Sequence, residues 1–593
     1  MKPFWDAFRL LNKKEQKEVY YLLPAIVIRA LLEVAAIMFL SPFLSLVTNP
    51  DSLSQSGFLS RLYDSLRFSS PGAFFIFMGT VSLVLIVVSN GFSMLVTWLL
   101  LRFSWLRDYT LSHRLLAAYL HRPYLFFLGR NTADMGKNML LEVQQGIRGV
   151  LIPGMQVVAN GVVALAIMLL LILMNPLMAL GLGVFLALAY LGIYGSLRRY
   201  LGRIGKARMQ ESKERFQTVN EALGGVKEIK LLAKEGFFLD RYAQTARRYA
   251  HYMAQSEVMA FLPKYLLDTL AFGGLVGILL YFLMAGKNLT DALPVIGLYA
   301  FAGYRLVPAL QQVYRSLSSM RFNAAVIKDI AQDLEGQPFQ GSEAERALAF
   351  QNEIRLEHLS FHYPDTQGAA LNDIHLSIRK NQSVAFVGST GSGKSTLVDL
   401  ILGLLNPSQG SIHIDGRPLE FKNLRAWQKN LGYVPQSIYL TDASIAENIA
   451  LGYTPSEIDQ KALEKAARIA NLHDFVLTLE KGYETFVGER GVRLSGGQRQ
   501  RIGIARALYH DPNILILDEA TSALDNVTEE AVFSAINKLM GQKTIIMIAH
   551  RISTVKHCDA IFVIEAGRIV SQGTYESLVS SSERFRALAQ VKG

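Results

Sequence analysis

Long apolar runs fill most of the first 345 residues, and their length restricts the possible folds more than any other feature. A helix needs about 20 apolar residues to cross the ~30 Å hydrocarbon core of a bilayer. Six stretches reach that length, at roughly 20–46, 74–101, 150–174, 177–197, 257–285 and 293–315. We therefore predict six membrane-spanning helices. Only Asn175 and Pro176 separate the third from the fourth, and a proline there ends one helix and allows a tight turn.

The distribution of lysine and arginine predicts how these spans are oriented. Segments 104–148 and 198–255 carry six and thirteen basic residues, whereas 47–73, 175–176 and 286–292 carry two, none and one. Basic loops stay on the cytoplasmic side of a membrane. We therefore expect both large loops and both termini in the cytoplasm. We attribute the net charge of +11 to this membrane topology and not to a nucleic-acid-binding surface.

The chain divides into three predicted parts. Residues 1–19 mix Trp, Phe and Leu with basic residues, which suits a helix lying in the inner membrane interface, here called the elbow helix. Residues 20–340 form the helical membrane domain, and residues 341–593 alternate short strands, helices and turns as an α/β domain does. A single cysteine among 593 residues excludes an internal disulfide framework.

A phosphate-binding loop opens the chemistry of the α/β domain. The strand-like SVAFV at 383–387 leads into GSTGSGKST at 388–396 and then into the helical TLVDLILGLL. Backbone N–H groups of such a glycine-rich loop converge on phosphate oxygens, its lysine neutralises the β/γ charge, and its serine can bind Mg²⁺. The predicted ATP contacts are Gly388, Ser389, Thr390, Gly391, Ser392, Gly393, Lys394, Ser395 and Thr396.

A second acidic element is ILILDE, an apolar strand that ends in Asp518 and Glu519. Ligands bind at the carboxyl ends of parallel strands. Asp518 is thus placed to hold Mg²⁺ through water, and Glu519 to orient or polarise the attacking water. Taken alone, two acids at a strand end are more often structural.

The sequence LSGGQ at 494–498 precedes a helical segment and identifies the family. With the P-loop before it and ILILDE after it, the region 345–590 resembles the ATPase domain of ABC transporters. The resemblance implies that Ser495, Gly496, Gly497 and Gln498 form the signature that contacts ATP.

The same resemblance implies further roles. Tyr363 would stack on adenine, Gln436 would sense Mg²⁺ and couple to the membrane domain, and His550 would reach the γ-phosphate. Asp525 belongs to the SALD segment that resembles the D-loop. The expected catalytic residues are Glu519, His550 and Gln436, and the expected Mg²⁺ ligands are Ser395, Gln436 and Asp518.

The family resemblance also implies a dimer. In ABC transporters each ATP lies between the P-loop of one subunit and the signature of the other, and this chain has one ATPase domain. The working species would be a pair of half-transporters, most simply a homodimer, with a heterodimer left open.

Six spans with two long cytoplasmic loops look like the exporter type of ABC membrane domain, whose loop tips carry coupling helices. We expect these near Arg122–Asp134 and Gly224–Glu235. Charged residues within spans are costly and need a reason. Arg29–Glu33 and Lys264–Asp268 have the spacing of intrahelical ion pairs, whereas Arg305 has no acidic residue three or four positions away.

The membrane half also looks similar to bacterial flippases of lipid-linked oligosaccharides. The similarity rests on LLEVAAIMFLSPFLSL, the outer amphipathic segment after it, LPKYLLD and YRLVPALQQV. It implies that Lys264 and Arg305 are cavity cations that contact a lipid pyrophosphate. The second span, which contains IVVSNGFSMLVTW, lacks the basic residue that this pattern would supply.

The leading hypothesis is an ATP-driven transporter that flips a lipid-linked oligosaccharide or a related amphiphile across the bacterial inner membrane. Alternatives within the class are a multidrug, lipid A-like lipid or peptide exporter. An ATP-gated channel is a competing hypothesis from another functional class. The six predicted spans argue against a nucleic-acid ATPase.

Overall fold

The computed structural model describes residues 1–48, 63–65, 68, 70–174, 176–284, 289–335, 347–364, 366, 368–519, 526–549 and 555–590. The chain forms two compact units. The first comprises Met1–Arg122 and Gly129–Pro338, and the second comprises Pro123–Leu128 and Phe339–Gly593. The predicted boundary at residue 340 falls outside the described residues, and so does most of the outer amphipathic segment that follows the first span.

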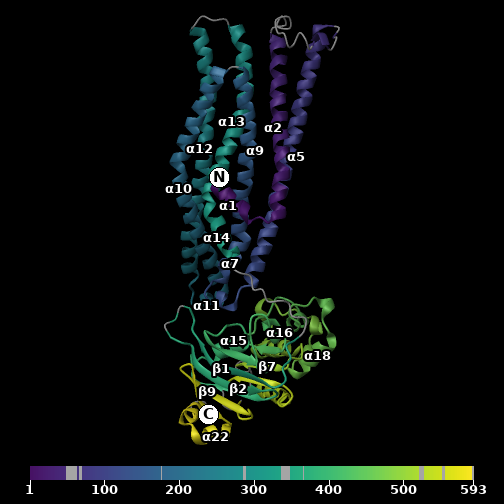
Figure 1. The fold of residues 1–593 in the computed structure, drawn as a ribbon, viewed down its shortest axis with the longest axis vertical. Helices are drawn as coiled ribbons and strands as arrows, with labels where there is room; N and C mark the ends of the chain where they lie inside the picture. The colour runs from purple at the N-terminus through teal and green to yellow at the C-terminus, as the bar shows by residue number, and fades with distance from the viewer. Residues whose placement is uncertain are drawn as a thin grey trace. The chain divides into compact units, whose positions relative to one another are not determined.

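Long helices build the first unit (Figure 1). Its six longest described helices are α2 (Lys13–Thr48), α5 (Pro71–Leu120), α9 (Ile152–Met174), α10 (Pro176–Gly224), α12 (Glu235–Met284) and α13 (Leu289–Phe322). Each contains one predicted span. Only two differ from their spans at an end: α9 begins two residues after the start of span 150–174, and α12 ends one residue before the end of span 257–285. Among the described residues, three helical stretches are long and apolar enough to cross a membrane: Lys13–Phe39, Pro71–Leu120 and Thr132–Leu173.

Several of these helices continue well beyond the predicted spans. α5 runs 50 residues to Leu120, so the segment after position 101 continues the same helix. α9 ends at Met174 and α10 begins at Pro176, as the proline predicts.

The elbow helix is shorter than predicted. α1 (Lys2–Leu10) ends well before residue 19, and Lys13 already starts α2. The reason is local, because Asn12 and Glu15 form reciprocal side-chain to backbone hydrogen bonds of 2.8 Å that begin a new helix. α1 buries Phe4, Ala7 and Phe8, and a Cβ at Gly154 would lie 2.0 Å from the Phe4 ring.

Shorter elements connect the long helices. They are α6 (Tyr124–Leu128), α7 (Thr132–Lys137), α8 (Val143–Gly146), α11 (Val226–Leu231) and α14 (Ala324–Leu334), with π-helical turns η1 (Asn138–Glu142) and η2 (Ile147–Leu151). α6 and α11 lie where the coupling helices are predicted. α6 groups with the second unit, although both flanking segments belong to the first.

A buried aspartate fixes α14 within the first unit. The Asp333 carboxylate accepts hydrogen bonds from Tyr119 Oη (2.6 Å), Arg130 Nη1 (2.8 Å) and Asn138 Nδ2 (3.1 Å). These partners come from α5, the segment before α7, and η1. Because a buried carboxylate needs partners to offset its lost hydration, this cluster specifies how these elements pack around α14.

Two sheets organise the second unit (Figure 1). The six-stranded sheet has the order β10–β9–β3–β8–β7–β6, and only edge strand β10 runs antiparallel to its neighbour. The four-stranded sheet is antiparallel, with the order β2–β1–β4–β5. The strands are β1 (Glu353–Phe361), β2 (Leu371–Arg379), β3 (Ser383–Val387), β4 (Gln409–Ile414), β5 (Arg417–Pro418), β6 (Leu431–Val434), β7 (Ile514–Asp518), β8 (Thr544–Ile548), β9 (Ala560–Glu565) and β10 (Arg568–Gly573).

Helices complete this α/β unit. They are α15 (Lys394–Ile401), α16 (Leu424–Gln428), α17 (Ile445–Ile449), α18 (Gln460–Ile469), α19 (His473–Leu477), α20 (Gly496–Leu508), α21 (Asn526–Asn537), α22 (Tyr575–Ser581) and α23 (Glu583–Gln590), with 3₁₀ turns η3 (Pro455–Glu457), η4 (Gly482–Glu484) and η5 (Glu489–Gly491).

The parallel strands are buried on both faces. Ala385 and Val387 of β3 pack into one hydrophobic core with α17, α18 and α20, while Val384 and Phe386 pack into a second core with the four-stranded sheet and α15. This double burial explains why β3, β7 and β8 read as nearly continuous apolar runs. It also places the ends of β3 and β7 at one edge of the sheet, where the functional residues lie.

Candidate functional site

The loop at 388–393 joins the end of β3 to the start of α15. Gly393 caps α15 with φ +105°, a left-handed conformation that favours glycine. A Cβ there would lie 2.7 Å from the Ala370 carbonyl oxygen. The glycines therefore permit both the turn and a close backbone approach, and the free N–H groups at the start of α15 form an anion-binding site.

Lys394 is folded back over this loop. Its Nζ donates hydrogen bonds to the carbonyl oxygens of Gly388 (3.0 Å) and Ser389 (2.8 Å), and the side chain is buried. The neighbouring Ser395 is exposed. The structure thus positions a buried cation and an accessible hydroxyl at the same loop.

Asp518 and Glu519 lie at the end of β7. Glu519 has φ +48°, an unusual conformation for a side chain other than glycine. Hydrogen bonds hold it there, because its N–H donates to Ile548 O (3.2 Å) and its carbonyl accepts from Gln500 Nε2 (3.3 Å). Gln436 Nε2 donates to Glu519 Oε2 at 2.9 Å. The fold therefore brings the two predicted residues Gln436 and Glu519 into contact. The sequence alone does not predict the contact of Gln500 with Glu519.

Two further groups, Asp399 and Tyr433, lie near the buried Asp518. Burial and the Glu519 charge raise the pKa of Asp518, against the opposing effects of the Tyr433 hydroxyl and Lys394. Burial, with Asp518 nearby, raises the pKa of Asp399 to about 6. Burial and the two carboxylates raise the pKa of Tyr433. The site therefore concentrates negative charge that a divalent cation would neutralise.

The sequence alone predicts a role for neither Asp399 nor Tyr433. Asp399 follows Lys394 by five residues within α15, and Tyr433 lies in β6. The only sequence signal for Asp399 is an acidic residue in the helix that follows a P-loop. That signal does not reveal its neighbour Asp518, which lies on a separate strand.

The LSGGQ segment begins α20. Ser495 caps the helix, since its Oγ accepts from Gln498 N (3.2 Å) and its N–H donates to Gln498 Oε1 (2.8 Å). Gly496 and Gly497 form the first turn. The structure thus gives this segment a helix N-terminus that favours an anion.

Tyr363 contacts the same loop and helix. Its Oη lies 3.1 Å from Thr396 Oγ1, and its ring packs edge-on against Phe361 with centroids 4.9 Å apart. The predicted stacking of Tyr363 on adenine stays a prediction. Asp525 and His550 lie outside the described residues, so their predicted roles also stay predictions.

Oxygen ligands suited to Mg²⁺ are available at this site. The Asp518 carboxylate, the Ser395 hydroxyl and the Gln436 amide are hard donors of the kind Mg²⁺ takes alongside phosphate oxygens. Among the described residues, no cluster of three or more His, Cys, Asp or Glu side chains could hold a metal. These residues fit an ion held jointly with a nucleotide.

A cavity of about 240 Å³ lies between α12 and α13 in the first unit. Lys264 lines it together with Arg315, Gln311 and Gln312. Arg305 does not line this cavity; its Nη2 donates to Asn90 Oδ1 at 3.3 Å. Lys264 therefore shares its cavity with Arg315, which the sequence does not predict, and Asn90 of the second predicted span contacts Arg305.

The two predicted intrahelical ion pairs have different outcomes. Arg29 Nε lies 2.9 Å from Glu33 Oε1, which confirms the first pair. In the described part of the chain Lys264 makes no ion pair with Asp268, which instead accepts from Gln311 Nε2 (3.2 Å). The predicted ion pair between Lys264 and Asp268 is therefore wrong, because the Asp268 carboxylate accepts a hydrogen bond from a side chain of α13 instead.

Comparisons with known proteins match both units. A family described as ABC transporter matches residues 371–522, and one described as ABC transporter transmembrane region matches residues 38–287. The ATP-dependent lipid A-core flippase of Cupriavidus metallidurans is 32% identical over 485 residues, which cover 80% of each chain. That of Saccharophagus degradans is 38% identical over 363 residues, so the match spans 61% of that relative's length.

A solved structure extends the comparison to nearly the whole fold. A bacterial Atm1-family ABC exporter with ATP bound superposes with a TM-score of 0.79 at 22% sequence identity. The match covers 97% of this chain and 98% of the exporter. It shows that the helical domain followed by an α/β nucleotide-binding domain is the exporter fold.

Proposed function

This chain belongs to the ABC transporter family, and from that premise we propose that it uses ATP hydrolysis to flip a lipid-linked oligosaccharide or a related amphiphile from the inner to the outer leaflet. The membrane domain and the ATPase domain lie on one chain, which is the architecture of a half-transporter. The names of its lipid A-core flippase relatives support a lipid-like cargo.

We assign ATP binding to the P-loop, from Gly388 to Thr396, with Tyr363 on the adenine. Lys394 would turn from the carbonyls of Gly388 and Ser389 toward the β/γ-phosphates, since a phosphate oxygen is a stronger partner for an ammonium than a neutral carbonyl. Ser395, Asp518 and Gln436 would hold Mg²⁺, which supplies charge neutralisation when bound.

Glu519 is the proposed residue that orients the attacking water. Its backbone is fixed by Ile548 and Gln500, and its carboxylate is held by Gln436. Because Gln436 contacts Glu519 directly, a shift of the Gln436 loop changes the position of the carboxylate. His550 would contact the γ-phosphate.

A second copy of this chain is the proposed partner. Ser495, Gly496, Gly497, Gln498 and Asp525 would complete the ATP site of the partner subunit, because each ABC nucleotide site combines a P-loop and a signature from different subunits. Both termini and the ATPase domain would lie in the cytoplasm, with the membrane domain in the bacterial inner membrane.

The observation that carries the cargo proposal is the cationic cavity lined by Lys264 and Arg315. Two cations at one cavity between membrane helices are costly unless an anion neutralises them. A phosphate or pyrophosphate linking a lipid to a glycan has that charge. Arg305 would add a further cation, oriented by Asn90.

The test is ATP-driven movement of a fluorescent polyprenyl-pyrophosphate glycan between leaflets of proteoliposomes. Glu519→Gln should stop movement and trap ATP. Lys264→Ala and Arg305→Ala should stop movement while sparing basal ATP hydrolysis. Arg102→Ala, at a span end and stacked on Trp98 at 5.2 Å, is the control that should transport normally.

ATP hydrolysis without movement of this glycan would refute the lipid-linked oligosaccharide as cargo. A lipid A-like lipid is then the next probe in the same assay. Full movement with the Glu519→Gln protein would refute the assignment of the catalytic carboxylate.

A further inference from the structure

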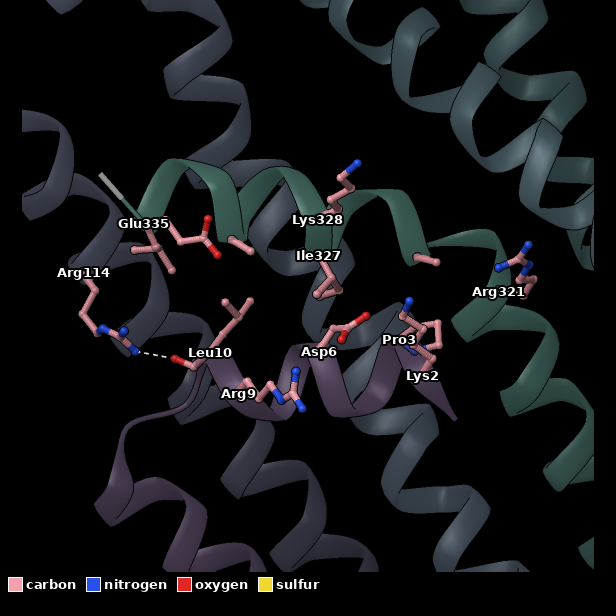
Figure 2. A pocket seen from close by; sticks show the side chains of 13 residues that line it. Lys2, Pro3, Asp6, Arg9, Leu10, Arg114, Arg321, Ile327, Lys328 and Glu335 are labelled. Carbon is pink, nitrogen blue, oxygen red and sulfur yellow. Dashed lines mark hydrogen bonds between the residues drawn. The ribbon is translucent and has the colours of Figure 1, made fainter. Parts of the chain in front are cut away.

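A second and larger cavity lies in the first unit, between the elbow helix α1 and α14. Its volume is about 670 Å³, within the range of small-molecule sites. Figure 2 shows α1 running alongside α14, with Arg114 beside Leu10 at one end and Arg321 at the other. The ATPase site and the Lys264 cavity share no residue with it.

The lining of this cavity, here called the elbow pocket, is strongly cationic. Five basic side chains and two acidic ones line it, namely Lys2, Arg9, Arg114, Arg321, Lys328, Asp6 and Glu335. The excess of three positive charges is large for so small a region. Clusters of this kind attract phosphate-bearing ligands.

The five cations divide into two groups. Arg114 Nη1 donates to the Leu10 carbonyl (2.6 Å), and Arg321 Nε donates to the Arg198 carbonyl (3.1 Å), so these two are held in place by neutral partners. Within the described part of the chain, Lys2, Arg9 and Lys328 make no ion pair. All three are exposed, and their charge is available to a ligand.

The predicted spans place the elbow pocket near the level of lipid headgroups. Phe4 of α1 packs on Gly154, the third residue of α9, where a predicted span begins. Arg321 follows the end of the predicted span 293–315 by six residues. Trp5 on α1 is 52% exposed, and an indole prefers the membrane interface.

From these observations we propose that the elbow pocket binds the phosphate of an anionic lipid headgroup from the cytoplasmic leaflet. The cations of α1 and α14 contact one phosphate together, and the acyl chains remain in the bilayer. The bound lipid thereby holds the elbow helix against α14. This site is separate from the cargo cavity and does not depend on the identity of the cargo.

Native mass spectrometry of the full-length protein with phosphatidylglycerol tests the proposal. Lys2→Gln/Arg9→Gln/Lys328→Gln should weaken the tightest lipid site at least about tenfold, since each cation near a membrane surface contributes measurably to anionic lipid binding. Phosphatidylcholine binding should be the same as in the unchanged protein.

A matched variant controls for delocalised charge. Arg203→Gln/Lys206→Gln/Arg247→Gln removes the same three charges from exposed positions on α10 and α12. It should retain the tight site. Equal weakening in both triple variants, or none in the first, would overturn the proposal.

Asp6→Asn provides a test that misfolding cannot mimic. Removing this carboxylate from the elbow pocket should tighten phosphatidylglycerol binding by a few-fold, and weaker binding would contradict the proposal. The source of the phosphate is tested by competition. Millimolar glycerol 3-phosphate should fail to displace the lipid; displacement would identify a soluble anion as the ligand and refute the lipid.

Discussion

Glycines in the P-loop differ in what surrounds them, although several share a left-handed backbone. Gly391 has φ +81° and Gly393 has φ +105°. Nothing lies within 4 Å of a Cβ at Gly391, whereas a Cβ at Gly393 meets Ala370 O at 2.7 Å and Leu371 Cδ2 at 2.8 Å. The two positions therefore separate the cost of backbone conformation from the cost of a steric clash.

We expect Gly393→Ala to weaken ATP binding at least about tenfold more than Gly391→Ala. Both substitutions carry the conformational cost of a positive φ, about 1 kcal/mol, but only the first pushes the loop away from the strand beside it. Fluorescent ATP binding to the full-length protein measures the difference. Equal affinities for the two variants would show that the close contact is unimportant.

Cys558, the single cysteine, is buried, and burial, with Asp559 nearby, raises the pKa of its thiol to about 12. The folded state thus favours the neutral thiol. Its contribution to stability is complete below the unfolded pKa of about 8.5 and is lost as pH rises through the folded value.

Native protein at pH 7.5 should react with iodoacetamide at least about a hundredfold more slowly than protein unfolded in detergent, because the thiolate is the reactive form. Mass spectrometry of Cys558 at timed intervals measures this. Rapid modification of the native protein would contradict the burial of the thiol.

At the scale of elements, two helices of the ATPase domain begin in the same way but at different places. Ser495 caps α20 and Ser444 caps α17, each through a reciprocal capping box. Their contributions to helix stability should be similar. Only Ser495 belongs to the signature.

Ser495→Ala and Ser444→Ala should each destabilise the protein by about 1 kcal/mol through loss of a cap. Only Ser495→Ala should in addition reduce ATP hydrolysis, because its hydroxyl is proposed to serve the partner subunit's nucleotide. Thermal unfolding and steady-state hydrolysis separate the two effects. Equal loss of hydrolysis in both variants would assign Ser495 a structural role alone.

At the scale of the molecule, the short helix α6 connects membrane-domain segments but groups with the ATPase unit. Its Leu125 packs against the hydrophobic core that also contains Trp427. Leu128 on the same helix is 49% exposed. This arrangement suits a helix that transmits nucleotide-driven movement to the spans.

Leu125→Ala should therefore reduce transport by at least about fivefold while ATP hydrolysis continues, whereas Leu128→Ala should alter neither. Flipping and hydrolysis measured on the same proteoliposomes test this. Parallel loss of both activities in Leu125→Ala would indicate a folding defect in place of uncoupling.

Much of this organisation follows from the sequence, because apolar run length and strand-loop-helix order are local signals. The P-loop, the end of β7 and the start of α20 could be located in that way. Contacts made by Gln500, Asp399 and Tyr433 could not, since each partner comes from a different element. For the same reason, the spacing of Lys264 and Asp268 predicted a pair that Gln311 of α13 displaces.

The two π-helical turns before α9 have one more consequence. Each π turn holds one residue more than an α turn, and one residue advances the helical phase by about 100°. The stretch from Thr132 to Met174 therefore behaves as an α-helix with two inserted residues. Relative to one uninterrupted stripe, the faces of its upstream and downstream segments are rotated by about 200°. A continuous helix can therefore offer one side to the short helices that precede α9 and nearly the opposite side to the long helices that pack on α9.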